Sequence, residues 1–337
     1  MKTDEKSTTK STIKSTTKSD TKSTTTLFWG IVLMLLSTIF LALMNALLKY
    51  LTMLGYSSME NVFFRAFFMV LTLYSIILFF PALSRISPRI KKPKLQAKQK
   101  GGFSSLLMRG LFGGVAVSIA YYNFATIPLG IATAFLQSTP IFVVFLSFFT
   151  RSKPSVFALV ATIVGFIGVL LVANPEASEI PLFNALIGII GAIFAAIAFL
   201  TIPTLKRFYT SEAVVLWYGI MMCIVGIIGM CVSIDKMGGF IFPSLFAWIP
   251  FILTGVVGTI GQWLMTKSYM FASPNVVAPI TYMRIVWSVF LGVLLGDSFP
   301  NLLPSIGIAL ILLSGALIGL NAIKKDSTKD SVSDSTK

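Results

Sequence analysis

Arg284 lies near the middle of the apolar stretch at 275–297, where a charged side chain is costly. Nine residues of the stretch precede it, thirteen follow, and none of them is charged before Asp297. A cation at the centre of a bilayer costs at least ~2.5 kcal/mol, and such residues usually have a function. The guanidinium fork suits a carboxylate or a phosphate. We therefore predict that Arg284 binds an anionic solute. The alternative is a structural arginine that pairs with backbone carbonyls exposed by Pro279.

Charged and amide side chains in two other apolar stretches are further candidates. Asn45 and Lys49 are four residues apart and share one helix face, although Lys49 is close enough to the stretch end to snorkel. Arg65 is a helical turn deeper than Glu60, which makes it the better candidate for binding a solute. Glu60 is the candidate for binding a coupling proton or cation. Its alternative role is to begin a helix, where negative charge is favourable.

Polar and aromatic side chains elsewhere complete the predicted binding set. Gln137 and Ser138 form a polar patch before a proline. Trp263 and Tyr282 lie deep in their stretches, and aromatic faces attract cationic groups. The predicted set consists of Arg284, Arg65, Asn45, Lys49, Gln137, Ser138, Tyr282, Trp287, Gln262, Trp263 and Tyr122.

Three tyrosines near the ends of apolar stretches have a second interpretation. Tyr121, Tyr122 and Tyr269 occupy positions at which aromatic side chains commonly anchor a helix at the membrane–water interface. We favour this anchoring role for all three.

The sequence offers little for covalent or metal chemistry. It contains no histidine, and its two cysteines, Cys223 and Cys231, share one apolar stretch in which a free thiol packs as a small hydrophobe. No clustered carboxylates are evident, and the phosphate-binding pattern G-x-x-x-x-G-K-[ST] is missing. We therefore expect no cofactor, no metal and no enzymatic activity. An intramembrane lipid-modifying enzyme is the alternative from another class of function.

The elements that must position these residues are membrane-spanning helices. Hydrophobic residues make up 55% of the 337-residue chain and charged residues only 12%, about half the share of a soluble domain. Uniformly apolar runs of about 20 residues span a bilayer as helices. Ten such runs are predicted, at 28–50, 59–80, 104–124, 128–150, 155–174, 182–204, 212–234, 245–268, 275–297 and 302–323.

The basic residues indicate how the chain is oriented. A Lys-Ser-Thr repeat fills 1–26, which we predict to be a disordered tail, and lysines also flank the tail at 324–337. Lysine and arginine gather in alternate loops, which is typical of the cytoplasmic side. Both termini are therefore predicted to be cytoplasmic. This distribution accounts for the net charge of +15 without a nucleic-acid partner.

The ten runs fall into two halves of five, at 27–175 and 176–323. "SMENVFFR" and "TSEAVVLW" open one equivalent pair of runs, and "ATIPLGIATAF" and "FASPNVVAPIT" lead into another. This alignment pairs Ser138 with Arg284. Because five is odd, the second half must insert upside down relative to the first. Inverted repeats are common in secondary transporters, with the substrate between the repeats near the midplane.

The ordered set of motifs resembles the ten-span EamA-type proteins of the drug/metabolite transporter superfamily. The motifs are "ENVFFRAFF" at 60–68, "ATIPLGIATAFLQSTPIFVVFLS" at 125–147, "GFIGVLL" at 165–171 and "VAPITYMRIVWSVFLGVLLGDSFP" at 277–300. The resemblance implies an all-α integral membrane protein of ten transmembrane helices, arranged as two inverted five-helix repeats. It also implies a multi-pass protein of the bacterial cytoplasmic (inner) membrane.

The expected function is secondary transport of a small polar metabolite by alternating access. Arg65 and Arg284 favour a solute with a carboxylate or phosphate, and the aromatic residues also allow a cationic part. An amino-acid or nucleoside-like zwitterion fits both. S-adenosylmethionine is the most specific expectation, because the second half resembles the branch that takes it up. Export of amino acids or other metabolites is the alternative. The expected partners are the solute and lipid, with a monomer or homodimer and an unspecified coupling ion or exchange solute.

Overall fold

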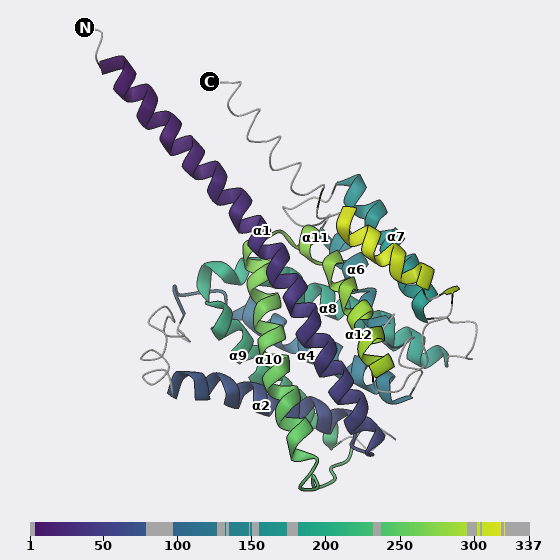
Figure 1. Ribbon diagram of the computed structural model, residues 1–337. Coiled ribbons are helices and arrows are strands. Elements are labelled where there is room, and N and C mark those ends of the chain that lie inside the picture. Colours follow the sequence, from purple (N-terminus) through teal and green to yellow (C-terminus); the bar gives the residue numbers. More distant parts are fainter. Residues whose placement is uncertain are drawn as a thin grey trace.

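The computed structural model describes 4–78, 97–126, 132, 135–147, 149, 155–173, 181–231, 237–294, 302–303, 305–317 and 320. These residues form helices, turns and short loops, and no strand occurs among them (Figure 1). The all-α prediction is therefore confirmed. The predicted C-terminal tail at 324–337 lies outside the described residues, as do the ends of several predicted spans.

Six long helices each contain an apolar segment that is long enough to cross a membrane. They are α1 (Asp4–Met53), α2 (Ser58–Leu78), α4 (Phe103–Thr126), α8 (Leu182–Phe208), α9 (Ser211–Met230) and α10 (Trp248–Phe271). Four shorter apolar helical segments lie at Phe135–Ser147, Val156–Gly168, Pro279–Leu291 and Ser305–Leu317. Each of the ten overlaps a different predicted span, which agrees with the predicted ten-helix bundle.

The N-terminal segment differs from the prediction. Residues 1–26 were expected to be disordered, whereas helix α1 begins at Asp4 and continues to Met53. Helix formation is limited by nucleation, and extending an existing helix adds one hydrogen bond per residue without a new nucleus. The apolar part of α1 that begins at Thr26 supplies this nucleus.

The contacts between helices follow the symmetry of two inverted repeats. α1 packs against α10 as its equivalent α8 packs against α4, and α4 packs against α9 as α10 packs against α2. α1 contacts α12 (Met283–Leu294) as α8 contacts α6 (Thr139–Ser147), while α2 and α9 pack on each other across the symmetry axis. α7 (Val156–Ala173) and the segment at 305–317 pack together at one edge of the bundle (Figure 1). This pairing supports the inverted architecture.

The ninth span is interrupted close to Arg284. α11 (Pro274–Val277) leads into the 3₁₀ turn η2 (Pro279–Tyr282) before α12 begins. Pro279 lacks the N–H that would bond the carbonyl one turn earlier in a continuous helix, which favours a break at this place. The Gln137 side-chain amide donates to the Thr281 carbonyl at 2.6 Å and so ties the start of the equivalent α6 region to this break.

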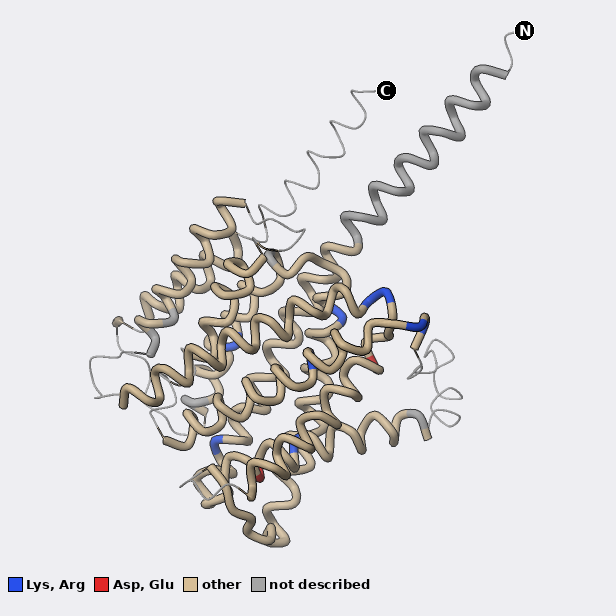
Figure 2. Tube along the Cα trace, turned by 180° about the vertical axis from the view of Figure 1, so that it is seen from behind, with Lys and Arg blue, Asp and Glu red and all other residues tan. Residues whose placement is uncertain are grey.

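The outside of the bundle suits a lipid environment. Large apolar side chains such as Leu35, Ile189 and Ile252 are exposed on the long helices. Figure 2 shows that charged positions are sparse along the described helices and that some Lys and Arg positions lie within the bundle rather than at its ends. Those internal charges mark the candidate site.

Candidate functional site

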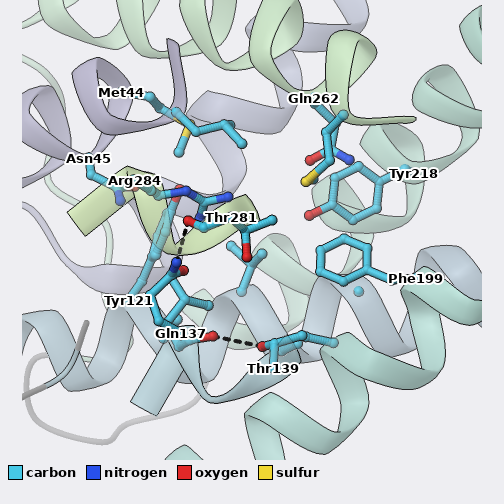
Figure 3. Close-up of a pocket in the computed structure, with 18 of the residues that line it drawn as sticks. Met44, Asn45, Tyr121, Gln137, Thr139, Phe199, Tyr218, Gln262, Thr281 and Arg284 are labelled. Atoms are coloured by element: carbon cyan, nitrogen blue, oxygen red, sulfur yellow. Dashed lines mark hydrogen bonds between the residues drawn. The ribbon is translucent and has the colours of Figure 1, made fainter. Parts of the chain in front are cut away.

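A buried pocket lies between the two halves of the bundle (Figure 3). Its volume is about 70 Å³, which is room for several water molecules. Its wall includes residues from α1, α2, α4, α8, α9, α10, η2 and the beginnings of α6 and α12. The polar side chains of its wall are Asn45, Arg65, Arg109, Tyr121, Gln137, Thr139, Tyr218, Gln262, Thr281 and Arg284.

Three arginines converge on this pocket from three helices. Arg65 on α2, Arg109 on α4 and Arg284 on α12 are 3%, 2% and 8% exposed. None of the described residues of the pocket wall is Asp or Glu. Taking a charge out of water costs several kcal/mol, and that cost is normally offset by a nearby opposite charge. The pocket wall provides the cations without supplying their counter-ions.

Aromatic side chains hold two of these guanidinium groups. Arg65 Nη1 donates a hydrogen bond to the Tyr121 hydroxyl at 2.8 Å. The Arg109 guanidinium carbon lies 4.3 Å from the ring centre of Tyr218 and 5.3 Å from that of Phe199, which are cation–π distances. Tyr218 and Phe199 lie together at one side of the pocket and Arg284 lies at the other (Figure 3). These contacts hold the guanidinium groups of Arg65 and Arg109 in place and leave the Nε donor of each without a partner among the described residues.

Several buried donors of the pocket wall have no acceptor within the described residues. They are the Nε groups of Arg65, Arg109 and Arg284, and the side-chain amide nitrogen of Gln262. A buried donor without a partner costs about 1–3 kcal/mol. The pocket therefore presents positive charge together with unused hydrogen-bond donors.

The starts of two helices contribute to the pocket wall. α6 begins at Thr139 and α12 begins at Met283, directly before Arg284. Both continue helical segments that begin earlier, and the Met283 N–H donates to the carbonyls of Ile280 and Thr281. The positive charge of the pocket therefore comes from its arginine side chains.

The structure brings together five residues of the predicted binding set. Arg284, Arg65, Asn45, Gln137 and Gln262 line the pocket. Among the wall residues that were not in that set, Arg109, Tyr121, Tyr218 and Phe199 supply a charge or an aromatic ring. Arg109 lies in the apolar sequence "LLMRGLFGG", near the start of a predicted span, where a basic side chain commonly reaches the interface, so the sequence did not identify it.

The other predicted residues lie outside the wall of this pocket, and several of them contact a neighbouring helix. The Tyr282 hydroxyl donates to the Thr162 carbonyl at 3.3 Å, and Trp287 Nε1 donates to Thr38 Oγ1 at 3.1 Å. The Ser138 hydroxyl donates to a carbonyl one turn earlier in its own chain segment. The residues outside the wall are Lys49, Ser138, Tyr122, Trp263, Tyr282 and Trp287.

Trp263 belongs to a cluster between α9 and α10. Its indole Nε1 donates to Glu212 Oε1 at 2.9 Å, and Lys267 Nζ lies 3.9 Å from the centre of its ring. Glu212 also accepts a hydrogen bond from Ser211 at 3.0 Å. These contacts give the Glu212 carboxylate hydrogen-bond partners at the start of α9 and hold α10 against α9.

The anchoring role predicted for two tyrosines is wrong. Tyr121 is 6% exposed and bonds Arg65, and Tyr269 is 1% exposed with its ring stacked on Phe199 at 5.2 Å. Both rings are buried among helices and do not reach a lipid interface, because neighbouring spans cover them. Tyr122 is half-buried and contacts Phe183 edge-on.

Glu60 occupies the first turn of α2, away from the arginine pocket. Its Oε2 accepts a hydrogen bond from the Ile241 backbone N–H at 3.4 Å, and its own N–H donates to Ser57 Oγ at 3.2 Å. The side chain is fully buried, and its Oε1 has no partner among the described residues. Its place fits the predicted start of a helix, and its coupling role stays a prediction.

Comparison with known proteins places this architecture in a family. Residues 28–174 match the EamA-like transporter family. An uncharacterized transporter of Helicobacter pylori is 36% identical over 308 residues, which cover 90% of this chain and 99% of that protein. A pseudopaline exporter of Pseudomonas aeruginosa is 27% identical over 88% of this chain and 97% of its own length.

Two further similarities fit the same assignment. An S-adenosylmethionine uptake transporter of Rickettsia bellii is 25% identical over 81% of this chain and 87% of its own length. A solved crystal structure with 15% sequence identity has a TM-score of 0.65, covering 88% of this chain and 98% of that one, and therefore shares the fold. The helical bundle, its inverted repeats and these relatives lead to one conclusion: the chain belongs to the EamA-like transporter family of the drug/metabolite transporter superfamily.

Proposed function

We propose that this protein is a secondary transporter that moves a small metabolite bearing carboxylate or phosphate groups across the bacterial cytoplasmic membrane. The observation that carries the proposal is the buried pocket between the repeats, lined by Arg65, Arg109 and Arg284 and by no described carboxylate. Intramembrane charges of this kind mark solute pathways. The proposed orientation, with both termini cytoplasmic, follows the distribution of basic residues in the sequence.

Alternating access accounts for the small size of the pocket. A volume of about 70 Å³ is small for a metabolite site, so we expect the pocket to widen when the solute enters. Solute entry requires the two repeats to separate on one side, as in rocking transporters. The hydrogen bond from Gln137 to the Thr281 carbonyl lies between the repeats and is one contact that this motion would change.

Relatives of this chain include proteins named for export and for uptake, so the direction is an outcome of the test. The intramembrane enzyme has less support. The described pocket wall supplies no carboxylate for acid–base catalysis, and the described residues contain no group of three or more His, Cys, Asp or Glu side chains that could hold a metal.

The experiment is transport of radiolabelled metabolites in proteoliposomes, in both directions, with the wild-type protein and Arg284→Ala. Arg207→Ala is the matched control, because Arg207 is exposed at the end of α8. We expect Arg284→Ala to lower transport at least ~10-fold, the effect of one lost hydrogen bond to a charged group. Equal transport by Arg284→Ala and wild type would contradict the binding role.

A further inference from the structure

We propose that the transported solute carries at least two negative charges, which Arg65, Arg109 and Arg284 bind together. This inference rests on the proposed function and specifies the substrate class of the same pocket. A dicarboxylate, a tricarboxylate and a phosphorylated carboxylate share the required chemistry.

The positive charge of the pocket needs negative charge to balance it. The pocket wall brings three buried guanidinium groups together with no Asp or Glu among the described wall residues. Arginine stays protonated in proteins, so this charge is not relieved by loss of a proton. A monoanion would leave two cations without compensation in a region of low dielectric constant. A dianion leaves one, and a trianion leaves none.

The hydrogen-bond donors of the pocket wall also match the acceptors of an anion. Every buried wall atom that lacks a partner in the described residues is a donor: three arginine Nε groups and the Gln262 amide nitrogen. The buried acceptors without partners, such as Glu60 Oε1 and Asn61 Oδ1, lie outside the wall. A carboxylate or phosphate offers acceptors only, whereas an ammonium or sulfonium group would face donors and like charge.

The three arginines are divided between the two repeats. Arg65 and Arg109 belong to the first half of the bundle, and Arg284 belongs to the second. A solute with two separated anionic groups can bind both halves at once. A ligand shifts a conformational equilibrium only by its difference in affinity between the states. A dianion that contacts both halves therefore stabilises the closed state more than a monoanion does. Transport would for this reason favour solutes with more negative charge.

The charge requirement conflicts with the most specific expectation from the sequence. S-adenosylmethionine carries one carboxylate and two cationic centres, and so it would bring net positive charge into a pocket that already holds three guanidinium groups. Under this proposal it is a poor substrate.

The test uses compounds of similar shape and graded charge: tricarballylate, glutarate, glutaramate and glutaramide. 2-Phosphoglycerate is added to compare phosphate with carboxylate, and S-adenosylmethionine serves as the cationic compound. Binding to purified protein is measured by the shift in melting temperature at constant ionic strength. Transport of each radiolabelled compound is then measured in proteoliposomes, with and without a counter-solute.

We expect binding and transport to increase with negative charge. Arg109→Gln and Arg284→Gln should each weaken dianion binding by about 10-fold or more, while the exposed Arg207→Gln leaves it unchanged. Glutaramate or S-adenosylmethionine moving as well as glutarate would overturn the charge inference and leave the transporter proposal intact. Polyanions that bind but do not cross would overturn the transporter proposal instead. If no compound of the series binds, the charge inference is wrong.

Discussion

Replacing Arg284 by methionine should make the empty protein more stable and weaken dianion binding by about 10-fold or more. Arg284 is 8% exposed, its Nε has no acceptor among the described residues, and two further guanidinium groups line the same pocket. Its structural alternative, pairing with carbonyls exposed near Pro279, predicts the opposite change in stability. One substitution therefore separates a binding arginine from a structural one.

The magnitude follows from the two penalties that the substitution removes. An unpartnered buried donor costs about 1–3 kcal/mol, and replacing buried charges by apolar side chains of similar volume is often stabilising by about 1–4 kcal/mol. Some packing contacts of the guanidinium are lost and offset part of this gain. We expect a net increase of about 1–3 kcal/mol in the free energy of unfolding, seen as a melting temperature several degrees higher.

The assay is thermal unfolding in detergent, followed by intrinsic fluorescence, in a buffer free of multivalent anions. Arg207→Met is the matched control, because its side chain is exposed and should change the melting temperature little. Addition of a dicarboxylate should raise the melting temperature of the wild type more than that of Arg284→Met at the same concentration. A lower melting temperature for Arg284→Met without ligand would refute the reasoning, because it would mean that the arginine is satisfied in the empty protein.

Two further substitutions test how the pocket is supported. At Gly113 an added Cβ would overlap Arg109 Nη1 and lie 2.8 Å from the Tyr218 ring. Gly113→Ala should therefore displace Arg109 and lower transport at least ~10-fold. Gly315→Ala is the control and should transport normally, because the space around Gly315 is open. Equal rates for the two alanine variants would contradict this role. Gln137→Ala removes the 2.6 Å bond to the buried carbonyl in η2 and should lower the unfolding free energy by about 1–3 kcal/mol, measured by thermal unfolding; an unchanged melting temperature would argue against it.

The helical architecture could be predicted because apolar runs long enough to span a membrane can be read directly from the sequence. Each of the ten apolar runs contains a helical segment, and the even spacing of equivalent motifs located the two halves. Pro279, which was predicted to expose backbone carbonyls, lies at the interruption of the ninth span, but the interruption itself was not predicted. The N-terminal segment was predicted less well, because low apolar content does not prevent a helix from extending backward from a stable one.

The pocket was predicted only in part, because burial depends on neighbours that are distant in sequence. Arg284 and Arg65 were found from their depth in apolar runs. Tyr121 and Tyr269 occupy run ends that are typical of lipid anchors, yet packing of other spans buries both. Arg109 lies close to the start of its run, where a basic residue commonly reaches the interface, and only the fold brings it to the pocket.

The most direct test of the central claim is an experimental structure of the protein with a transported solute bound. We expect the solute to lie between the two repeats, with its carboxylate or phosphate oxygens within hydrogen-bond distance of Arg65, Arg109 and Arg284. We also expect the pocket to be larger than the 70 Å³ of the described conformation. A solute bound at another place, or one that occupies this pocket with its anionic groups directed away from all three guanidinium groups, would contradict the account.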